Sequence, residues 1–311
     1  METPNVSAVP TTSALAAFSD ALADAVASAG RSIVRVDGRQ RQAASGIVWT
    51  SDGLIVTADH VVERDDDLTV GLPDGTTVRA QLVGRDPGSD LALLKADAEG
   101  LTPLARDGAP RVGGIALIVA RPGPDLMASF GTIVAIGGPI RTRRGGRLDG
   151  TIATDATFYP GFSGAPLISA TGGAVGLATS RFQGGRGGGV VIPIGVVERT
   201  VAALSSHGRV RRGFVGIGSQ PVRLPDALRE RLGLTDRETG LLVVTVEPGG
   251  PADKAGLLLG DVILAFAGEP VREPGELRDL LSSERVGQPA TLAIVRGGEP
   301  RELTLTVGER A

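Results

Sequence analysis

Ser163 is the residue of this chain whose surroundings are best suited to nucleophilic catalysis. It lies in a Gly-Phe-Ser-Gly sequence after Tyr159 and Pro160, residue types that permit a tight turn and expose the hydroxyl. In such a turn the backbone N–H groups of Gly161 and Ser163 could converge on a developing oxyanion. The motif alone is weak evidence, because an ordinary turn between two strands uses the same residue types.

His60 is the candidate base for this hydroxyl. A serine needs a base that titrates near neutrality, and histidine is the usual one. The chain has two histidines, and His207 lies in a short polar stretch. His60 instead ends the apolar run 55–62 (IVTADHVV). A lone histidine is more often structural, so the position of His60 alone does not identify it as a base. It is the better candidate because the other histidine, His207, lies in the predicted linker.

Asp90 is the candidate third member. It is predicted to open strand 91–95, which is apolar on both faces and therefore buried. A buried carboxylate without a partner is costly, and an imidazole Nδ1–H would satisfy it. The alternative is a turn aspartate bonded to nearby N–H groups, which Asp86 before Pro87 fits better than Asp90. His60, Asp90 and Ser163 follow one another in the chain order of the chymotrypsin triad.

Composition excludes several classes of protein. The chain has 311 residues, of which 41% are hydrophobic and 46 are glycine, so most of it is expected to fold. A net charge of −3 argues against nucleic-acid binding, and the absence of cysteine excludes disulfides and Cys-based zinc sites. We expect no metal, no cofactor and no membrane span. The N-terminus lacks a charged signal-peptide region, so a cytoplasmic location is predicted unless an upstream leader was removed.

Hydrophobic periodicity divides the chain into an N-terminal leader with a helix (1–30), a β domain (31–206), a linker (207–212) and an α+β domain (213–308). In the leader, apolar residues recur at helical spacing between Ser13, a potential cap, and Gly30. About eleven short strands follow without intervening helices, which is typical of an all-β barrel or sandwich. They span 32–36, 45–50, 54–57, 68–72, 78–83, 91–95, 115–119, 130–136, 151–154, 174–179 and 189–192, before a helix at 194–206. Gly-rich stretches at 141–147 and 184–189 are predicted to be flexible loops.

The C-terminal part mixes helices and strands. Strands are predicted at 214–219, 241–247, 261–266, 290–295 and 302–307. Helices are predicted at 225–232 and 274–283, and a short helix that ends at residue 255 follows the turn at 248–251. Pro225 is expected at the first position of its helix, with Gly233 behind it. This pattern is that of a small α+β domain.

The chain resembles the HtrA/Deg family of serine proteases, which are chymotrypsin-like double β-barrels followed by a PDZ domain. The matching motifs are residues 45–48 (SGIV), 56–62 (VTADHVV), 86–95 (DPGSDLALLK), 154–156 (TDA), 161–167 (GFSGAPL), 213–217 (GFVGI), 247–257 (EPGGPADKAGL) and 260–263 (GDVI). The resemblance covers residues 14–308. It implies a mainly β fold, catalytic roles for His60, Asp90 and Ser163, and an oxyanion hole formed by the N–H groups of Gly161 and Ser163.

Two residues of the serine motif depart from the family pattern. Phe162 stands where the family usually has Asn, and Ala165 where it usually has Gly. The oxyanion donors are backbone groups, so Phe162 does not delete them. In chymotrypsin-like proteases the residue six before the serine often forms the base of the primary specificity pocket. Here it is Thr157, with Ala178, Thr179 and Val190 as small or apolar walls, so small or medium aliphatic P1 residues are expected.

The PDZ motif predicts a second binding site. A loop at 212–216 would hold a terminal carboxylate by backbone N–H groups, and an extended peptide would add to the strand edge behind it. The residues expected to contact the peptide are Gly213, Phe214, Val215, Gly216, Ile217, Leu277 and Leu281. The alternative is a small domain that only packs on the protease.

Two functions remain open at this point. The first is an ATP-independent serine endopeptidase that cleaves unfolded or damaged proteins and binds peptide C-termini at its PDZ domain. The second is a catalytically weak or inactive peptide-binding, chaperone-like scaffold, for which Phe162 would be the sign. The family often forms trimers through N-terminal aromatic residues, of which Phe18 is available here, so a homo-oligomer is an open expectation.

Overall fold

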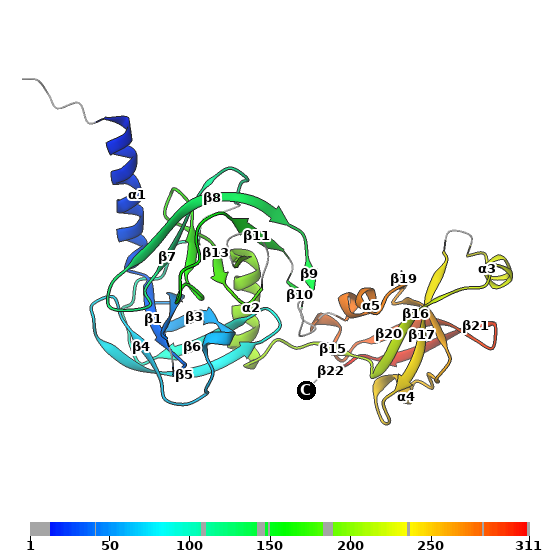
Figure 1. Cartoon of the computed structure of the whole chain (residues 1–311). Coiled ribbons are helices and arrows are strands. Elements are labelled where there is room, and N and C mark those ends of the chain that lie inside the picture. The colour runs from blue at the N-terminus through cyan, green and yellow to red at the C-terminus, as the bar shows by residue number, and fades with distance from the viewer. Residues whose placement is uncertain are drawn as a thin grey trace, which may run out of the picture. The chain divides into compact units, whose positions relative to one another are not determined.

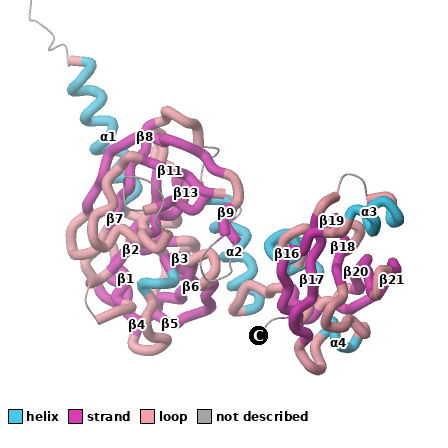
Figure 2. Tube along the Cα trace, turned by 45° about the vertical axis from the view of Figure 1, so that its right-hand side comes forward, coloured by secondary structure: helices cyan, strands magenta, loops and turns pink. Residues whose placement is uncertain are grey.

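The computed structural model describes residues 13–40, 42–106, 110–141, 147–148, 150–182, 189–234, 237–281 and 283–309. The chain forms two compact units, Met1–Arg209 and Val210–Ala311. Most of the two predicted Gly-rich loops lies outside the described residues. Figures 1 and 2 show that strands dominate both units.

The first barrel consists of six antiparallel strands that close in the order β1-β2-β3-β6-β5-β4. They are β1 (Ile33–Asp37), β2 (Ala44–Val48), β3 (Leu54–Ala58), β4 (Leu68–Gly71), β5 (Thr77–Asp86) and β6 (Leu91–Ala96). Small and branched aliphatic side chains such as Val34, Ile55 and Leu94 fill the interior. The last residue of β3, Ala58, pairs with the first residue of β6, Leu91. The segments that follow β3 and precede β6 therefore leave the barrel side by side.

The second barrel has the strand order β11-β14-β13-β12-β7-β8 and belongs to the same unit as the first barrel. Its strands are β7 (Ile115–Ala120), β8 (Met127–Gly137), β11 (Thr151–Thr154), β12 (Pro166–Ile168), β13 (Ala174–Thr179) and β14 (Val190–Pro193). A separate pair is formed by β9 (Ile140–Arg141) and β10 (Arg147–Leu148). The loop between β11 and β12 carries Ser163.

Two helices belong to the barrel unit. The N-terminal helix α1 (Ala14–Gly30) is capped by Ser13, whose Oγ accepts from the Ala16 N–H at 3.1 Å. Helix α2 (Ile194–His207) packs on β5, β6 and β13. On α1, Phe18 meets Phe130 of β8 edge to face, and both rings are exposed. The homo-oligomer stays a prediction.

The second unit is a small α+β domain built on the sheet β16-β17-β18-β20-β21, with β16 at one edge. Its strands are β15 (Gly213–Phe214), β16 (Ile217–Arg223), β17 (Thr239–Val246), β18 (Val262–Phe266), β19 (Glu269–Pro270), β20 (Pro289–Arg296), β21 (Glu299–Thr306) and β22 (Gly308–Glu309). Its helices are α3 (Asp226–Leu232), α4 (Pro251–Lys254), α5 (Pro274–Leu280) and the 3₁₀ turn η2 (Ser283–Arg285).

The predicted mainly β architecture is confirmed, with corrections to individual elements. Strands β9, β10 and β12 were not predicted, because two or three residues carry no measurable periodicity. Pro225 is the cap of α3 rather than its first residue. Helix α5 ends at Leu280, short of the predicted residue 283. Among the described residues, no helix is long and apolar enough to cross a membrane.

Candidate active site

His60 and Asp90 form a bonded pair at one end of the first barrel. His60 lies in the 3₁₀ turn η1 (Asp59–Val61) directly after β3, and Asp90 directly precedes β6. His60 Nδ1 is 2.8 Å from Asp90 Oδ2 and 3.1 Å from Oδ1, and the His60 backbone N–H donates to Oδ1 at 2.9 Å. The pairing of β3 with β6 creates this contact. An Asp90 carboxylate bonded at Nδ1 leaves His60 Nε2 as the nitrogen that can accept a proton.

Asp90 itself is fully buried and has an unusual backbone conformation. Its φ of +59° is in the left-handed region, which aspartate tolerates better than most residues. The hydroxyl of Thr179 donates to Asp90 Oδ2, and Arg181 Nε lies 4.0 Å from Oδ1. Asp90 therefore stands one residue before its strand rather than opening it, and Thr179 is already bonded to this carboxylate. Asp86 is the turn aspartate, since it accepts from the N–H groups of Gly88 and Ser89.

An arginine that the sequence did not point to fixes the turn that carries His60. Arg85 of β5 donates from Nε to Asp59 Oδ1 at 2.6 Å, and Asp59 is buried. A second nitrogen, Nη2, donates to the Val62 carbonyl at the other end of the turn. No sequence motif links Arg85 to His60, because only the pairing of strands places it there.

Ser163 is almost fully buried and lies in the loop between β11 and β12 of the second barrel. Its Oγ is 3.0 Å from Ser180 Oγ and accepts from the Ser180 N–H at 3.3 Å. Within the part of the chain that the structure describes, no hydrogen bond joins Ser163 Oγ to His60. Catalytic hydrogen bonds are often long in free enzymes, and the hydroxyl would have to turn from Ser180 to His60 before attack.

The serine loop has the backbone form that an oxyanion hole needs. Gly161 and Gly164 have φ values of +86° and +87°, which favour glycine. A Cβ on Gly164 would lie 2.0 Å from the Ser45 carbonyl oxygen, so no other residue fits. The N–H groups of Gly161 and Ser163 have no acceptor among the described residues. Among the described residues, the two N–H groups expected to bind the oxyanion are therefore not bonded to other groups.

Phe162, the departure from the family pattern, anchors this loop. Phe162 is 1% exposed, and its ring packs among the side chains of the second barrel. It meets the Tyr159 ring edge to face, with 5.4 Å between the ring centroids. Its N–H donates to the Tyr159 carbonyl at 3.1 Å. Phe162 thus replaces polar contacts by hydrophobic burial and leaves both neighbouring N–H groups free.

The predicted specificity residues are only partly brought together. Thr179 and Val190 are direct partners in the register of β13 with β14, and Ala178 precedes Thr179; all three are buried. Thr157 is exposed in the loop after β11. Phe158, the residue after Thr157, is partly buried and packs against the core of the second barrel. An aliphatic P1 preference remains a prediction.

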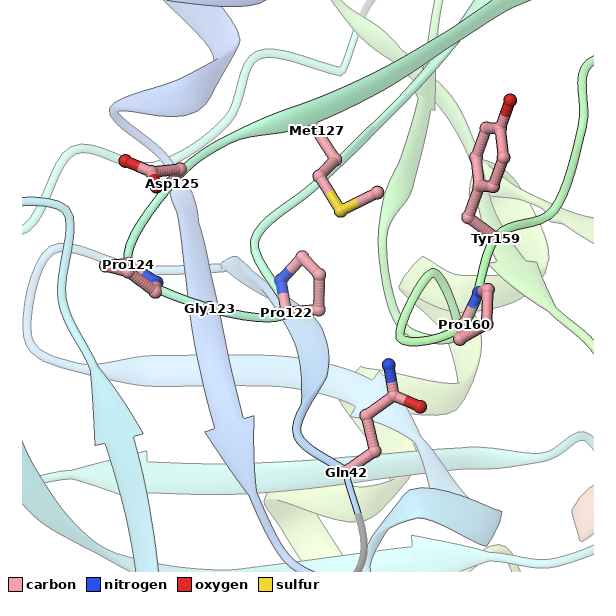
Figure 3. Close-up of a pocket in the computed structure, with 8 residues that line it drawn as sticks. All are labelled: Gln42, Pro122, Gly123, Pro124, Asp125, Met127, Tyr159 and Pro160. Carbon is pink, nitrogen blue, oxygen red and sulfur yellow. The ribbon is translucent and has the colours of Figure 1, made fainter.

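A cavity of about 490 Å³ flanks the serine loop on the side of Gly161. It lies between the loop that joins β7 to β8 and the Tyr159–Pro160 segment, as Figure 3 shows. The lining residues are Gln42, Pro122, Gly123, Pro124, Asp125, Met127, Tyr159 and Pro160. The side chain of Pro122 packs so closely on Gly161 that a Cβ there would lie 2.3 Å from it.

The predicted peptide-binding residues of the second unit surround the start of the edge strand β16. Gly213 and Phe214 form β15, and the N–H groups of Val215 and Gly216 have no acceptor among the described residues. The Gly213 N–H donates at 3.1 Å to the carbonyl of Leu281, which follows α5. Ile217 begins β16, and α5 packs against that strand. Leu277 is buried in the core of the unit, whereas Leu281 is partly buried.

Family models match both units. The trypsin-like peptidase domain matches residues 44–177, and the PDZ domain matches residues 216–307. The protein is thus a trypsin-like peptidase joined to a PDZ domain. The HtrA-type protease AlgW, solved with a tripeptide, is 32% identical, with 93% of this chain and 97% of that chain covered and a TM-score of 0.74. The chain belongs to the HtrA family of serine proteases, as the sequence motifs predicted.

Other relatives extend this comparison. The serine endoprotease of Yersinia pestis has a TM-score of 0.76 at 28% identity, covering 98% of this chain and all of that one. Proteins named probable periplasmic serine endoprotease DegP-like match from Ectopseudomonas mendocina (36% identity, 87% of this chain, 58% of the relative) and Rhizobium meliloti (36%, 88% and 55%). The chain spans a little over half the length of these curated relatives. The predicted cytoplasmic location is wrong, because these relatives are named periplasmic.

Proposed function

We propose that this protein is a serine endopeptidase in which His60, Asp90 and Ser163 form the catalytic triad. The observation that carries the proposal is the bonded His60–Asp90 pair beside a serine loop with two free N–H groups. The first barrel supplies the base and its partner, and the second supplies the nucleophile and the oxyanion donors.

In the first half of the reaction, Ser163 Oγ attacks the carbonyl carbon of a peptide bond while His60 Nε2 takes the hydroxyl proton. The carbonyl oxygen becomes an oxyanion, which the N–H groups of Gly161 and Ser163 would stabilise. Asp90 stabilises the imidazolium and does not itself take the proton. His60 then donates that proton to the leaving amine as the C–N bond breaks, which leaves an acyl-Ser163 ester.

In the second half, water attacks the ester carbon and His60 takes a proton from the water. A second oxyanion forms in the same place and collapses, and the proton returns to Ser163 Oγ. The carboxylic acid product leaves and the free enzyme is restored. No cofactor or ATP takes part in either half.

The substrates we propose are unfolded or damaged polypeptides, with their C-termini bound at the PDZ domain. The cavity of about 490 Å³ supports a polypeptide substrate, because Pro122 and Pro160, which line it, lie next to Gly161 and leave room beside the serine loop. The free edge of β16 supports the addition of a peptide strand. The names of the relatives support an extracytoplasmic location.

The scaffold alternative rested on Phe162. The buried ring and the two free N–H groups beside it favour a working oxyanion loop over a lost one. Reaction of Ser163 with a fluorophosphonate separates these two functions, since a scaffold without a working triad would not react.

We expect kcat/KM to fall in acid and to level off above neutrality. A protonated imidazole cannot accept the serine proton, and imidazoles ordinarily titrate near pH ~6.5. The measurement is kcat/KM for a short aliphatic peptide between pH 5 and 8, with circular dichroism at each pH to show that the protein stays folded. A flat profile in a folded protein would exclude His60 as the base.

We expect Gly216→Ala to weaken binding of a peptide C-terminus about tenfold. Gly216 has a φ of +79°, where a Cβ costs ~1–2 kcal/mol, and the loop would relieve this by rotating its N–H groups. Gly268→Ala is the matched control, because Gly268 has a φ of +82° and open space around it. Fluorescence anisotropy on the Ser163→Ala protein gives the affinity. Equal affinity for the acid and the C-terminally amidated peptide would contradict carboxylate recognition.

A further inference from the structure

Ser45 of β2 connects the serine loop to the opposite barrel. The residue is fully buried, and its Oγ donates to the Gly161 carbonyl at 3.0 Å. Its backbone N–H donates to the Ser163 carbonyl at 3.1 Å. One residue of the first barrel thus holds the carbonyl groups of both residues whose N–H groups would bind the oxyanion.

The same hydroxyl is linked to Arg121, which follows β7. The Arg121 backbone N–H donates to Ser45 Oγ at 2.9 Å, so the hydroxyl accepts one hydrogen bond and donates another. This arrangement fixes the direction of the hydroxyl proton toward Gly161. Pro122, the next residue, packs directly on Gly161.

The Arg121 side chain reaches the end of helix α1. Its Nε donates to the Ile33 carbonyl at 2.9 Å, and Nη2 donates to the Gly30 carbonyl at 3.1 Å. The third nitrogen, Nη1, donates to the Pro124 carbonyl at 2.8 Å and so fixes the loop that lines the cavity. Arg121 is 8% exposed as a residue, and its guanidinium donates to three carbonyls, which fixes the position of its own backbone.

We propose that Ser45 is a positioning residue for the oxyanion hole, and that hydrogen bonds through Arg121 couple it to the end of helix α1. This inference rests on the proposed function of Gly161 and Ser163. Neither Ser45 nor Arg121 contacts His60 or Asp90 through any hydrogen bond among the described residues. The hydrogen bonds from Arg121 through Ser45 to Gly161 therefore position the groups that would bind the oxyanion and leave the contacts of His60 unchanged.

We expect Ser45→Ala to lower kcat about 10- to 100-fold with little change in KM. Loss of one oxyanion donor costs ~10²–10³-fold, and a displaced donor costs less than a deleted one. The pH at which activity is half-maximal should stay where it is in the wild type, because His60 and Asp90 keep their contacts. A shifted midpoint would overturn the assignment, since it would mean that Ser45 acts on the base.

Thr57→Val is the matched control for a purely structural role. Thr57 Oγ1 donates to the Ser45 carbonyl at 2.7 Å and packs against Gly164, and valine keeps the shape of this side chain while removing only its hydrogen bond. Both variants should lose thermal stability, yet Thr57→Val should keep kcat within about twofold of the wild type. Equal losses of kcat in the two variants would show that Ser45 matters only for folding.

Hydrogen exchange gives a readout that does not depend on activity. The full-length Ser45→Ala protein should exchange amides faster in peptides that cover residues 158–166 than the wild type does, and Thr57→Val should not. Unchanged exchange in this loop would overturn the inference even if the enzyme proved inactive. If the wild type has no peptidase activity but the loop still exchanges faster in Ser45→Ala, the proposed function is wrong. The positioning role of Ser45 in the loop would still hold.

A double-mutant cycle tests the link to α1. Arg121→Met should lower kcat, and Ser45→Ala combined with Arg121→Met should lower it less than the product of the two single effects. Arg121→Lys keeps the charge but not the three donors, so it should recover only part of the loss. Independent, multiplicative effects would show that Arg121 does not act through Ser45.

Discussion

Ser163→Ala is expected to reduce kcat/KM for casein or a short peptide by ~10⁴-fold or more, while the protein keeps its fold. The substitution removes the hydroxyl that is proposed to form the acyl ester and leaves the backbone N–H groups of residues 161 and 163 in place. His60→Ala should have an effect of similar size, since the hydroxyl would then have no base. Thermal unfolding of each variant shows that the loss is chemical.

Ser180→Ala is the control for the identity of the nucleophile. Ser180 Oγ lies 3.0 Å from Ser163 Oγ, so both hydroxyls are within reach of the same site. If Ser163 is the nucleophile, Ser180→Ala keeps most of the activity. The assignment is wrong if Ser163→Ala cleaves undiminished or if Ser180→Ala loses as much.

Asp90→Asn is expected to lower kcat/KM by ~10²–10⁴-fold, a loss similar to or smaller than that of Ser163→Ala. An asparagine tolerates the backbone φ of +59° and fills the same volume, so the fold should survive. The side-chain NH₂ of asparagine can donate to His60 Nδ1, whereas the aspartate carboxylate only accepts from it. An imidazole that accepts at Nδ1 carries its proton on Nε2, and this tautomer cannot take the serine proton. The Thr179 hydroxyl would also lose its charged acceptor.

Asp86→Asn separates this effect from a general cost of altering a buried aspartate in the same segment. Asp86 is also buried, but it accepts from the N–H groups of Gly88 and Ser89 rather than from His60. We expect it to lower stability and leave kcat/KM nearly unchanged. Wild-type activity in Asp90→Asn, or an equal loss in both variants, would contradict the role of Asp90.

The sequence predicted the fold, and it pointed to the candidate site, because the signals for both are local. Runs of Val, Ile and Leu mark the strands, and Gly161 and Gly164 mark a turn that only glycine can make. The Asp90 prediction came from the cost of burying a carboxylate, and the structure pairs it with His60. The same local logic gave the cap at Ser13 and the turn at Asp86.

The contacts that the sequence did not reveal depend on how the strands pair rather than on any local pattern. Arg85 and Ser180 reach the site only through strand pairing or barrel contact, and neither belongs to a motif that the sequence offered. Ser45 was matched only as part of the 45–48 motif, and Thr179 was expected as a pocket wall, so the hydrogen bonds of Ser45 to Gly161 and of Thr179 to Asp90 were not predicted. Phe162 was read as a lost polar contact, whereas it is a buried anchor, because burial depends on the neighbouring strands. The cytoplasmic prediction rested on the residue types near the N-terminus, and the names of the relatives overturn it.

The most direct test of the proposed triad is the stoichiometry and position of fluorophosphonate labelling on the full-length protein. Covalent reaction needs an activated hydroxyl and oxyanion donors, so it reports on the assembled site rather than on any one residue. We predict one adduct per chain, mapped by mass spectrometry to Ser163, and none on the Ser163→Ala or His60→Ala proteins. A folded wild type that stays unlabelled, or carries the adduct on another serine, would contradict the account.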